Sequence, residues 1–323
     1  MEGTIYNVSQ AGPPLQVEPL TVEGAVVRFS AKLLDLTFEG TLAADGQSIS
    51  GTTIQAGERH TLTLQRVSEQ NTWAVPETVK PMPADATPKF DVVTIKPSDP
   101  TRTGKGFDFR GRHMVTFNTN VNDLITFAYG VHAKQIAGGP AWLTTEHFDL
   151  DGVPDVEGHA NLKQMKMLIQ SALADRFRLT FHREDRELAV YALTLAKGGP
   201  KLTKTAHAPT DATAFYYRGL GKLTVTNATM ADFCSGMQGS AMDKPVVDHT
   251  GLTDRYDFQL KWTPDQSQFA AMGVTIPPAN LDDPNAPPSL YTALQEQLGL
   301  KMEPTRAKAD VIVIDHIEKP TAN

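Results

Sequence analysis

From residue 4 to residue 67, short apolar segments stand among Thr, Glu and Gly, without the spacing of an amphipathic helix. Asp45-Gly46 separates two such segments with a dipeptide that favours a tight hairpin turn, and Thr61–Gln65 alternates again. The pattern predicts an antiparallel β-meander over residues 1–74, with one face toward a core and the other toward water. The prolines that follow predict an extended linker over residues 75–89.

Helical periodicity begins at residues 121–128, directly after asparagines that can cap a helix. A longer apolar stripe predicts a second helix over residues 162–177. The charged residues 182–187 favour a solvated hairpin between two short strands. The strands expected in this part of the chain are residues 90–95, a pair of short strands within 107–117 that turns near Gly111, and residues 179–181 and 188–195.

The pattern around the first helix returns later in the chain, where residues 227–233 repeat residues 118–124. Four further matches follow in unchanged order: 139–142 with 244–247, 148–150 with 256–258, 172–179 with 293–300, and 190–193 with 311–314. Such self-similarity indicates an internal repeat, in which each unit runs helix, strand, helix, strand, strand.

We therefore expect an α+β fold, in which an N-terminal antiparallel β-meander precedes two pseudo-repeated αβαββ units, residues 90–205 and 206–323. A unit of this size buries little apolar surface alone, so the two are expected to pack together. Ligand sites often lie between packed halves, so the functional interpretation of the repeat is a ligand-binding cleft between the two units. The structural interpretation is that the duplication only adds stability.

The chain resembles a large uncharacterised family that is expanded in soil Acidobacteria, usually exported, and also found fused to BlaR1-type sensor peptidases. The resemblance covers about residues 90–320 and implies no catalytic residue. The motifs that carry it are Phe90–Ser98, Ala128–Val131, Gly138–Trp142, Leu173–Phe177, Pro245–Leu252 and Ile314–Pro320. It implies an extracytoplasmic location, periplasmic or secreted.

Residues 2–67 resemble a lipocalin-like β-meander that precedes various exported acidobacterial hydrolases. Compared with that meander, residues 2–67 are expected to begin late and to lack the opening strands, which would leave a sheet edge that a second copy of the chain can pair with. The partner that the resemblance suggests is therefore a second copy of the chain, in a homodimer formed through this edge.

Composition narrows the possible functions. The net charge of -7 argues against a nucleic-acid partner, because binding the phosphate backbone requires clustered Lys and Arg. No apolar run is long enough for a transmembrane helix, and Met1 leads directly into polar sequence, so no signal peptide is expected in this chain. Cys234 is the single cysteine, which excludes an intrachain disulfide, and its place on a helix stripe predicts a buried thiol.

Four carboxylates around Gly152 make calcium the candidate cofactor, because Ca²⁺ prefers several hard oxygen ligands. Gly152 stands at the wrong position for an EF-hand, and the alternative interpretation is a polar strand-to-helix loop. The candidate metal ligands are Asp149, Asp151, Asp155 and Glu157.

No established catalytic motif is present. A Ser–His–Asp arrangement can be assembled only from separate parts, with Ser240 or Ser289 as the nucleophile. The structural alternative is a turn at Thr250-Gly251. The remaining candidate catalytic residues are Asp248, His249, Asp254 and Asp257.

Aromatic residues and one histidine could line a pocket for a sugar or an acyl ligand, although packing in the core is the default interpretation. The candidate ligand-binding residues are Tyr129, His132, Trp142, Tyr256 and Trp262. The leading hypothesis is an exported ligand-binding or sensory protein for a small molecule. The alternative is a hydrolase of esters or lactones, assisted by calcium, and a third reading is a purely structural assembly module.

Overall fold

The computed structural model describes residues 3–6, 15–31, 36–55, 58–68, 72, 80–102, 104–209, 213–270, 274–276 and 286–321. The chain divides into two compact units. The first unit comprises residues 1–80 and 109–111, and the second comprises residues 81–108 and 112–323.

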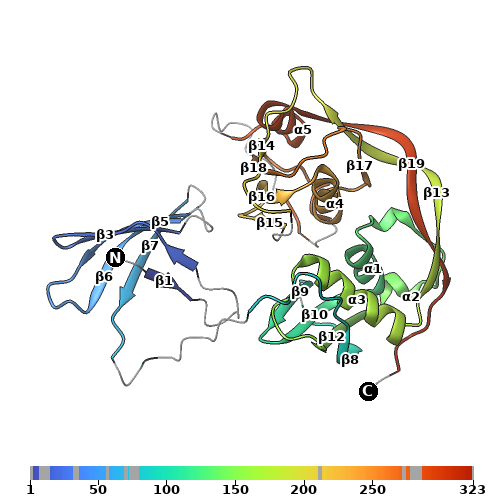
Figure 1. Ribbon diagram of the computed structural model, residues 1–323, viewed down its shortest axis with the longest axis horizontal. Coiled ribbons are helices and arrows are strands. Elements are labelled where there is room, and N and C mark those ends of the chain that lie inside the picture. Colours follow the sequence, from blue (N-terminus) through green and yellow to red (C-terminus); the bar gives the residue numbers. More distant parts are fainter. Residues whose placement is uncertain are drawn as a thin grey trace. The chain divides into compact units, whose positions relative to one another are not determined.

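The first unit is built from antiparallel strands, as the alternating pattern predicts. Its main sheet has the order β3-β4-β5-β6-β7, and β1 pairs with β2 beside it (Figure 1). Asp45-Gly46 lies in the β5–β6 turn, where Gly46 adopts a positive φ of 67°. The strands are β1 (Gly3–Ile5), β2 (Leu15–Val17), β3 (Leu20–Glu23), β4 (Val26–Ala31), β5 (Leu36–Leu42), β6 (Ser48–Gln55) and β7 (Glu58–Gln65).

The second unit contains two stretches of mixed helix and strand, which we call the first half (residues 90–195) and the second half (residues 203–316). In the first half, α1 and α3 pack on each other and on the sheet β8-β12-β10-β9. Both predicted helices are confirmed, and each begins with a capping box, at Asn120 and Asn161. The elements are β8 (Phe90–Pro97), β9 (Gly106–Arg110), β10 (His113–Asn120), α1 (Val121–Tyr129), η3 (Ala133–Gln135), β11 (Ile136–Ala137), α2 (Trp142–Thr145), β12 (His147–Pro154), α3 (Leu162–Arg176) and β13 (Thr180–Leu195).

The second half packs α4, α5 and η5 on the sheet β14-β18-β16-β15. Its core gathers Phe233, Met237, Leu260 and Trp262, all at most 2% exposed. Cys234 also lies in this core, so the predicted buried thiol is confirmed. The elements are β14 (Thr203–Lys204), β15 (Ala214–Tyr217), β16 (Lys222–Ala228), α4 (Met230–Ser240), β17 (Val246–Asp248), β18 (Tyr256–Lys261), α5 (Leu290–Ala293), the π-helical η5 (Leu294–Leu298) and β19 (Leu300–His316).

The hairpin predicted over residues 182–187 is wrong, because β13 runs through this segment as one strand. Its register with β19 extends from Thr180 opposite His316 to Leu195 opposite Leu300. The charged side chains that suggested a turn instead pair across the ribbon, as in the contact of Arg183 with Asp310. Solvent-exposed charges are therefore compatible with a long strand when the facing strand carries their partners.

Both halves contribute to one shared sheet with the order β11-β19-β13-β17. The short strand β11 of the first half pairs in parallel with β19 of the second, with Ile136 opposite Ile312. The short strand β17 of the second half pairs in parallel with β13 of the first, with Tyr191 opposite Val246. Each half thus adds an edge strand to the long strand of the other, and the β13–β19 ribbon spans both (Figure 1).

The predicted order of elements within each half needs two corrections. The last two expected strands of the first half form the single strand β13. The matched segments 139–142 and 244–247 also differ, because Trp142 begins the helix α2 whereas Val246 begins the strand β17. In the shared sheet, β17 is one edge strand, and the opposite edge strand is β11 rather than a strand from residues 139–142.

Candidate functional site

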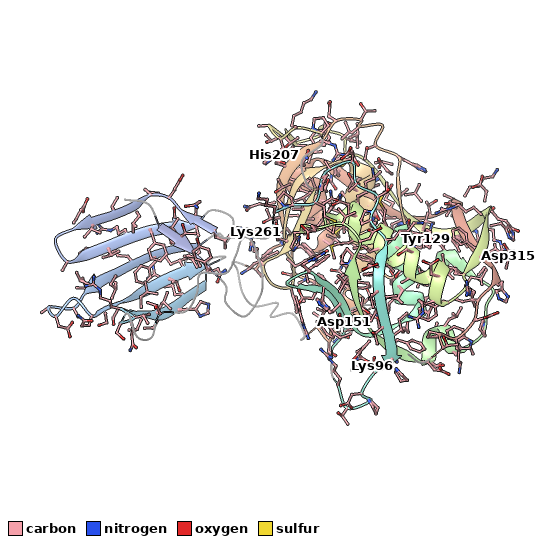
Figure 2. All side chains as sticks on the ribbon, turned by 60° about the horizontal axis from the view of Figure 1, so that its bottom comes forward. Lys96, Tyr129, Asp151, His207, Lys261 and Asp315 are labelled. Atoms are coloured by element: carbon pink, nitrogen blue, oxygen red, sulfur yellow. The ribbon has the colours of Figure 1, made fainter. Side chains whose placement is uncertain are left out.

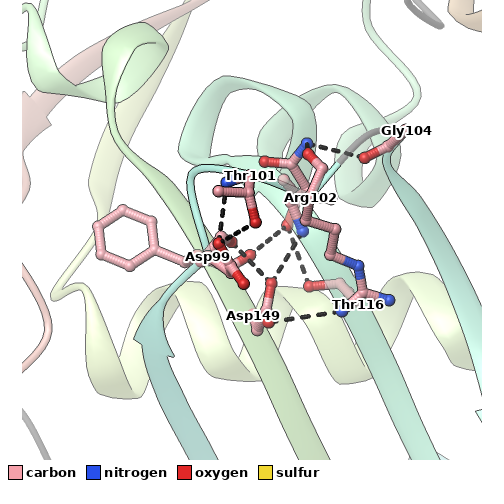
Figure 3. A network of polar contacts seen from close by, with 10 residues as sticks. Asp99, Thr101, Arg102, Gly104, Thr116 and Asp149 are labelled. Atoms are coloured by element: carbon pink, nitrogen blue, oxygen red, sulfur yellow. Dashed lines mark hydrogen bonds and ion pairs between the residues drawn. The ribbon is translucent and has the colours of Figure 1, made fainter.

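Asp149, a predicted calcium ligand, accepts hydrogen bonds that fix the start of α1. Its Oδ1 accepts from the backbone N–H of Asn118 at 2.9 Å and from Ser98 Oγ at 2.7 Å (Figure 3). Asn118 has a positive φ of 51° next to a register shift between β10 and β12. Burial raises the pKa of Asp149, but the hydrogen bonds from Asn118 and Ser98 together with the charges of Arg102 and Lys96 outweigh it and hold this pKa below its usual range, so the carboxylate stays charged.

The other three predicted calcium ligands point to separate partners. Asp151 bonds His113 Nδ1 at 2.6 Å, Asp155 accepts from the N–H of Lys89, and Glu157 lies 3.5 Å from Arg112. Within the described part of the chain, no three His, Cys, Asp or Glu side chains are grouped to hold a metal ion. The structure does not bring the four carboxylates together, and calcium binding stays a prediction.

The predicted catalytic carboxylates are likewise held by local bonds. Asp248 Oδ1 accepts from both the N–H and the Oγ1 of Thr250, which forms the turn that was the structural alternative. Asp257 accepts from the N–H of Asn227 at 2.7 Å and from Thr205 Oγ1 at 3.0 Å. Asp254 pairs with Lys204.

Neither candidate serine meets a histidine among the described residues. Ser240 Oγ bonds the phenol of Tyr217 at 2.6 Å and the backbone of Gly236, while Ser289 caps α5. His249 is exposed, and its backbone N–H donates to Leu193. In the described part of the chain, the contacts of these side chains therefore assemble no triad.

The predicted ligand-binding aromatics divide between the two halves. Tyr129 packs edge-on against Phe181, and it lies well apart from Asp151 of the predicted calcium set (Figure 2). Tyr256 and Trp262 lie in the core of the second half, where Trp262 Nε1 donates to Gln268. Trp142 faces Lys319. These aromatic residues do not form one surface. His132, the remaining candidate ligand-binding residue, lies where the two halves contact each other through polar groups.

The two halves meet at the C-terminal end of α1 through polar side chains. Gly130 ends this helix with a φ of 67°, and its carbonyl accepts from Ser235 Oγ at 3.3 Å and from Gln238 Nε2 at 2.7 Å, both on α4. A Cβ at Gly130 would lie only 3.0 Å from Ser235 Oγ. Gln238 is 7% exposed, and its Oε1 accepts from the N–H of Val246. One glutamine thus ties α1 to both α4 and β17.

His132 and Gln135 form a second set of contacts between the halves. Gln135 Oε1 accepts from the N–H of His132, and its Nε2 donates to the carbonyl of Asp310 on β19 at 2.9 Å. His132 Nδ1 accepts from the N–H of Lys134, and the imidazole also bonds the backbone of Met242. We call Gly130, His132, Gln135, Ser235 and Gln238 the polar junction.

Burial decides the charge of the histidine in the polar junction. His132 is 7% exposed, and desolvation lowers the pKa of its imidazole, an effect that the cation of Lys134 reinforces. The bond to Met242 and the carboxylate of Asp243 act in the opposite direction but do not prevail. The imidazole is therefore neutral at pH 7, with Nδ1 as the acceptor.

A second group of polar side chains, with Tyr191 buried and the other members at least partly exposed, begins directly beside the polar junction. Tyr191 OH donates to Asp243 Oδ1 at 3.0 Å, and the ring of Tyr191 lies 6.1 Å from that of Tyr291 on α5. The ammonium of Lys244 lies 4.9 Å from the centre of the Tyr191 ring and 3.8 Å from Asp243 Oδ2. We call Tyr191, Asp243, Lys244 and Tyr291 the Tyr191 cluster.

The Tyr191 cluster carries no net charge. Burial raises the pKa of the Tyr191 phenol, and the neighbouring Tyr291 and Asp243 raise it further, so the phenol keeps its proton. Asp243 and Lys244 carry opposite charges. Reasoning from the sequence missed this cluster because its parts come from β13, the loop before β17 and α5, and no local pattern links them.

These features define an α+β protein in which two halves share a central sheet and meet at polar side chains. Residues 122–317 match the family model described as a protein of unknown function (DUF3738), which is more than half of the chain, and the chain therefore belongs to this family. No curated protein and no solved structure matches it. Among the described residues, no helix has the length and apolar character needed to cross a membrane.

Proposed function

We propose that this protein is an exported ligand-binding or sensory protein, and that its small-molecule ligand is held beside the polar junction. The observation that carries the proposal is the junction itself, where the halves meet through Gln238, Gln135 and the neutral His132. Contacts between separately packed parts of a chain are often more polar than a core, and ligands often bind next to them.

The proposal includes an internal duplication of the two halves. Taken in chain order, the sheets β8-β12-β10-β9 and β14-β18-β16-β15 connect their strands in the same way. A second support is the pair of bonds made by Asn118 to Asp149 and by Asn227 to Asp257, each next to a register shift and each with a positive φ at the asparagine. Two similar halves that exchange edge strands would create a junction suited to one ligand.

The family resemblance supplies the cellular part of the proposal. Related domains in Acidobacteria are exported or fused to BlaR1-type sensor peptidases, which fits a protein that reports a ligand outside the cytoplasm. The first unit, with its lipocalin-like meander, is proposed as an accessory module. Its sheet order leaves β3 and β7 as edges in the described residues, and the proposed homodimer would form there.

A ligand screen on the full-length protein tests the proposal. The thermal midpoint is measured against a library of small molecules, and a specific ligand at about 100 times its Kd should add about 2.7 kcal/mol to stability. Binding should weaken in Gln238→Ala and persist in Gln259→Ala, since Gln259 is exposed on β18. A library that leaves the midpoint unchanged would contradict the proposal.

The same protein preparation tests the hydrolase alternative and its calcium. A panel of p-nitrophenyl esters and lactones, with and without EDTA, measures turnover, and His249→Ala measures its dependence on the candidate histidine. Turnover that disappears in His249→Ala would replace the binding function by the hydrolase. Calorimetry with calcium tests Asp151 and Asp155 as ligands, through comparison with the Asp151→Asn and Asp155→Asn variants.

A further inference from the structure

The Tyr191 cluster has hydrogen-bonding groups that the protein itself leaves available. Asp243 uses Oδ1 for Tyr191, while the distance of 3.8 Å from Oδ2 to Lys244 exceeds a hydrogen bond. Among the described residues, no hydrogen bond is made to the Lys244 ammonium, so its three N–H groups can all donate elsewhere. An acceptor and several donors thus lie within one small area.

The same area presents an aromatic surface. Tyr291 is 36% exposed, whereas its neighbour Tyr191 is only 7% exposed and held by Asp243. Tyr191 therefore supports Tyr291 from one side, and a ligand can approach the exposed part of Tyr291. A phenol combines a flat apolar face with a hydroxyl that both donates and accepts.

Charge decides which ligand class suits these groups. Asp243 and Lys244 neutralise each other, the phenol of Tyr191 keeps its proton, and the nearby His132 is neutral. A cationic ligand would meet the Lys244 ammonium and an anionic ligand would meet the Asp243 carboxylate, and both would lose hydration without a net opposite charge. A neutral ligand with many hydroxyl groups avoids this cost and can use every donor and acceptor.

We propose that the Tyr191 cluster binds a neutral carbohydrate, with a sugar ring against Tyr291 and its hydroxyl groups on Asp243 and Lys244. Sugar rings have apolar C–H faces that pack on aromatic rings, and vicinal hydroxyls that both donate and accept. This inference rests on the proposed ligand-binding function and names the ligand class for it.

Calorimetry with defined oligosaccharides tests the ligand class on the full-length protein. The neutral probes are cellotetraose, xylotetraose and maltotetraose, and the charged probes are tetragalacturonate and a glucosamine tetramer. At least one neutral probe should bind, with about tenfold weaker affinity in Tyr291→Ala and in Asp243→Asn. Tyr291→Phe, which keeps the ring, should retain more affinity than Tyr291→Ala. Tyr216→Ala, a change at an exposed tyrosine on β15, should leave the affinity unchanged.

The outcomes separate this inference from the proposed function. Binding of only a charged probe, or binding that Tyr291→Ala and Asp243→Asn leave intact, overturns the carbohydrate assignment. If no oligosaccharide binds but the small-molecule screen finds another ligand that depends on Gln238, the ligand class is wrong and the binding function stands. If neither experiment finds a ligand, both are wrong. Thermal midpoints of the variants, expected near that of the unmodified protein, show that the substitutions preserve the fold.

Discussion

Replacing Gln238 by alanine should measure how firmly the two halves are joined. The substitution removes the 2.7 Å bond to the Gly130 carbonyl and the 3.0 Å bond from the Val246 N–H. Gly130 keeps Ser235 as a partner, but the buried Val246 N–H loses the amide oxygen that it bonds. A buried donor left without a partner costs about 1–3 kcal/mol, and a lost hydrogen bond about 1 kcal/mol. We expect Gln238→Ala to destabilise the second unit by about 3 kcal/mol.

Urea unfolding followed by circular dichroism and tryptophan fluorescence provides the measurement. Trp142 lies in the first half and Trp262 in the second, so both halves contribute to the fluorescence. Gln238→Met keeps the volume of the side chain and isolates the loss of hydrogen bonds, while Gln259→Ala is the exposed control and should change stability by less than about 0.5 kcal/mol. A Gln238→Ala variant as stable as the Gln259→Ala control would refute the idea that this glutamine holds the halves together.

Three further predictions follow from other parts of the structure. Burial lowers the pKa of His132 below its unfolded value of about 6.5, so the contribution of His132 to stability is complete above that pH and declines as the pH falls below it. His132→Asn keeps an acceptor for the Lys134 N–H and should reduce this pH dependence of the urea midpoints between pH 7 and 5. An unchanged pH profile in the variant would show that other groups cause the dependence. Asn118→Ala should lower the free energy of unfolding by about 2 kcal/mol, because alanine disfavours the positive φ and loses the hydrogen bond from Nδ2 to the Gly104 carbonyl. Asn118→Gly should lower it less, because glycine accepts the positive φ. Equal losses of stability for the two variants in urea unfolding would contradict the role of the backbone conformation. Light scattering at high concentration should give twice the chain mass of 35.2 kDa if the edge of the first unit pairs two copies, and a single-chain mass would remove that prediction.

Local signals in the sequence were sufficient for the helices and for the meander. Residues 121–129 and 162–176 carry both an apolar stripe and an asparagine that accepts a backbone N–H at the helix start, so their boundaries follow from neighbours in the chain. The turn at Asp45-Gly46 has the same origin, because its positive φ is set by the dipeptide itself.

Pairing between distant segments decided the rest, because it depends on partners that no local pattern contains. The charged residues 182–187 form a strand only since β19 lies opposite with matching charges. From the sequence, Asp149 is a candidate metal ligand and Asp257 a candidate catalytic residue. In the structure, the register shifts at Asn118 and Asn227 place both carboxylates as acceptors for backbone N–H groups.

The candidate site is the clearest case of a feature that only the tertiary structure creates. Tyr191 and Tyr291 come from a strand and a helix far apart in the chain, and Asp243 reaches Tyr191 because β17 of one half pairs with β13 of the other. The same exchange of strands brings Gln238 to Gly130. The sequence by itself determined the helices, the meander and the family, whereas the polar junction and the Tyr191 cluster exist only through packing of the halves.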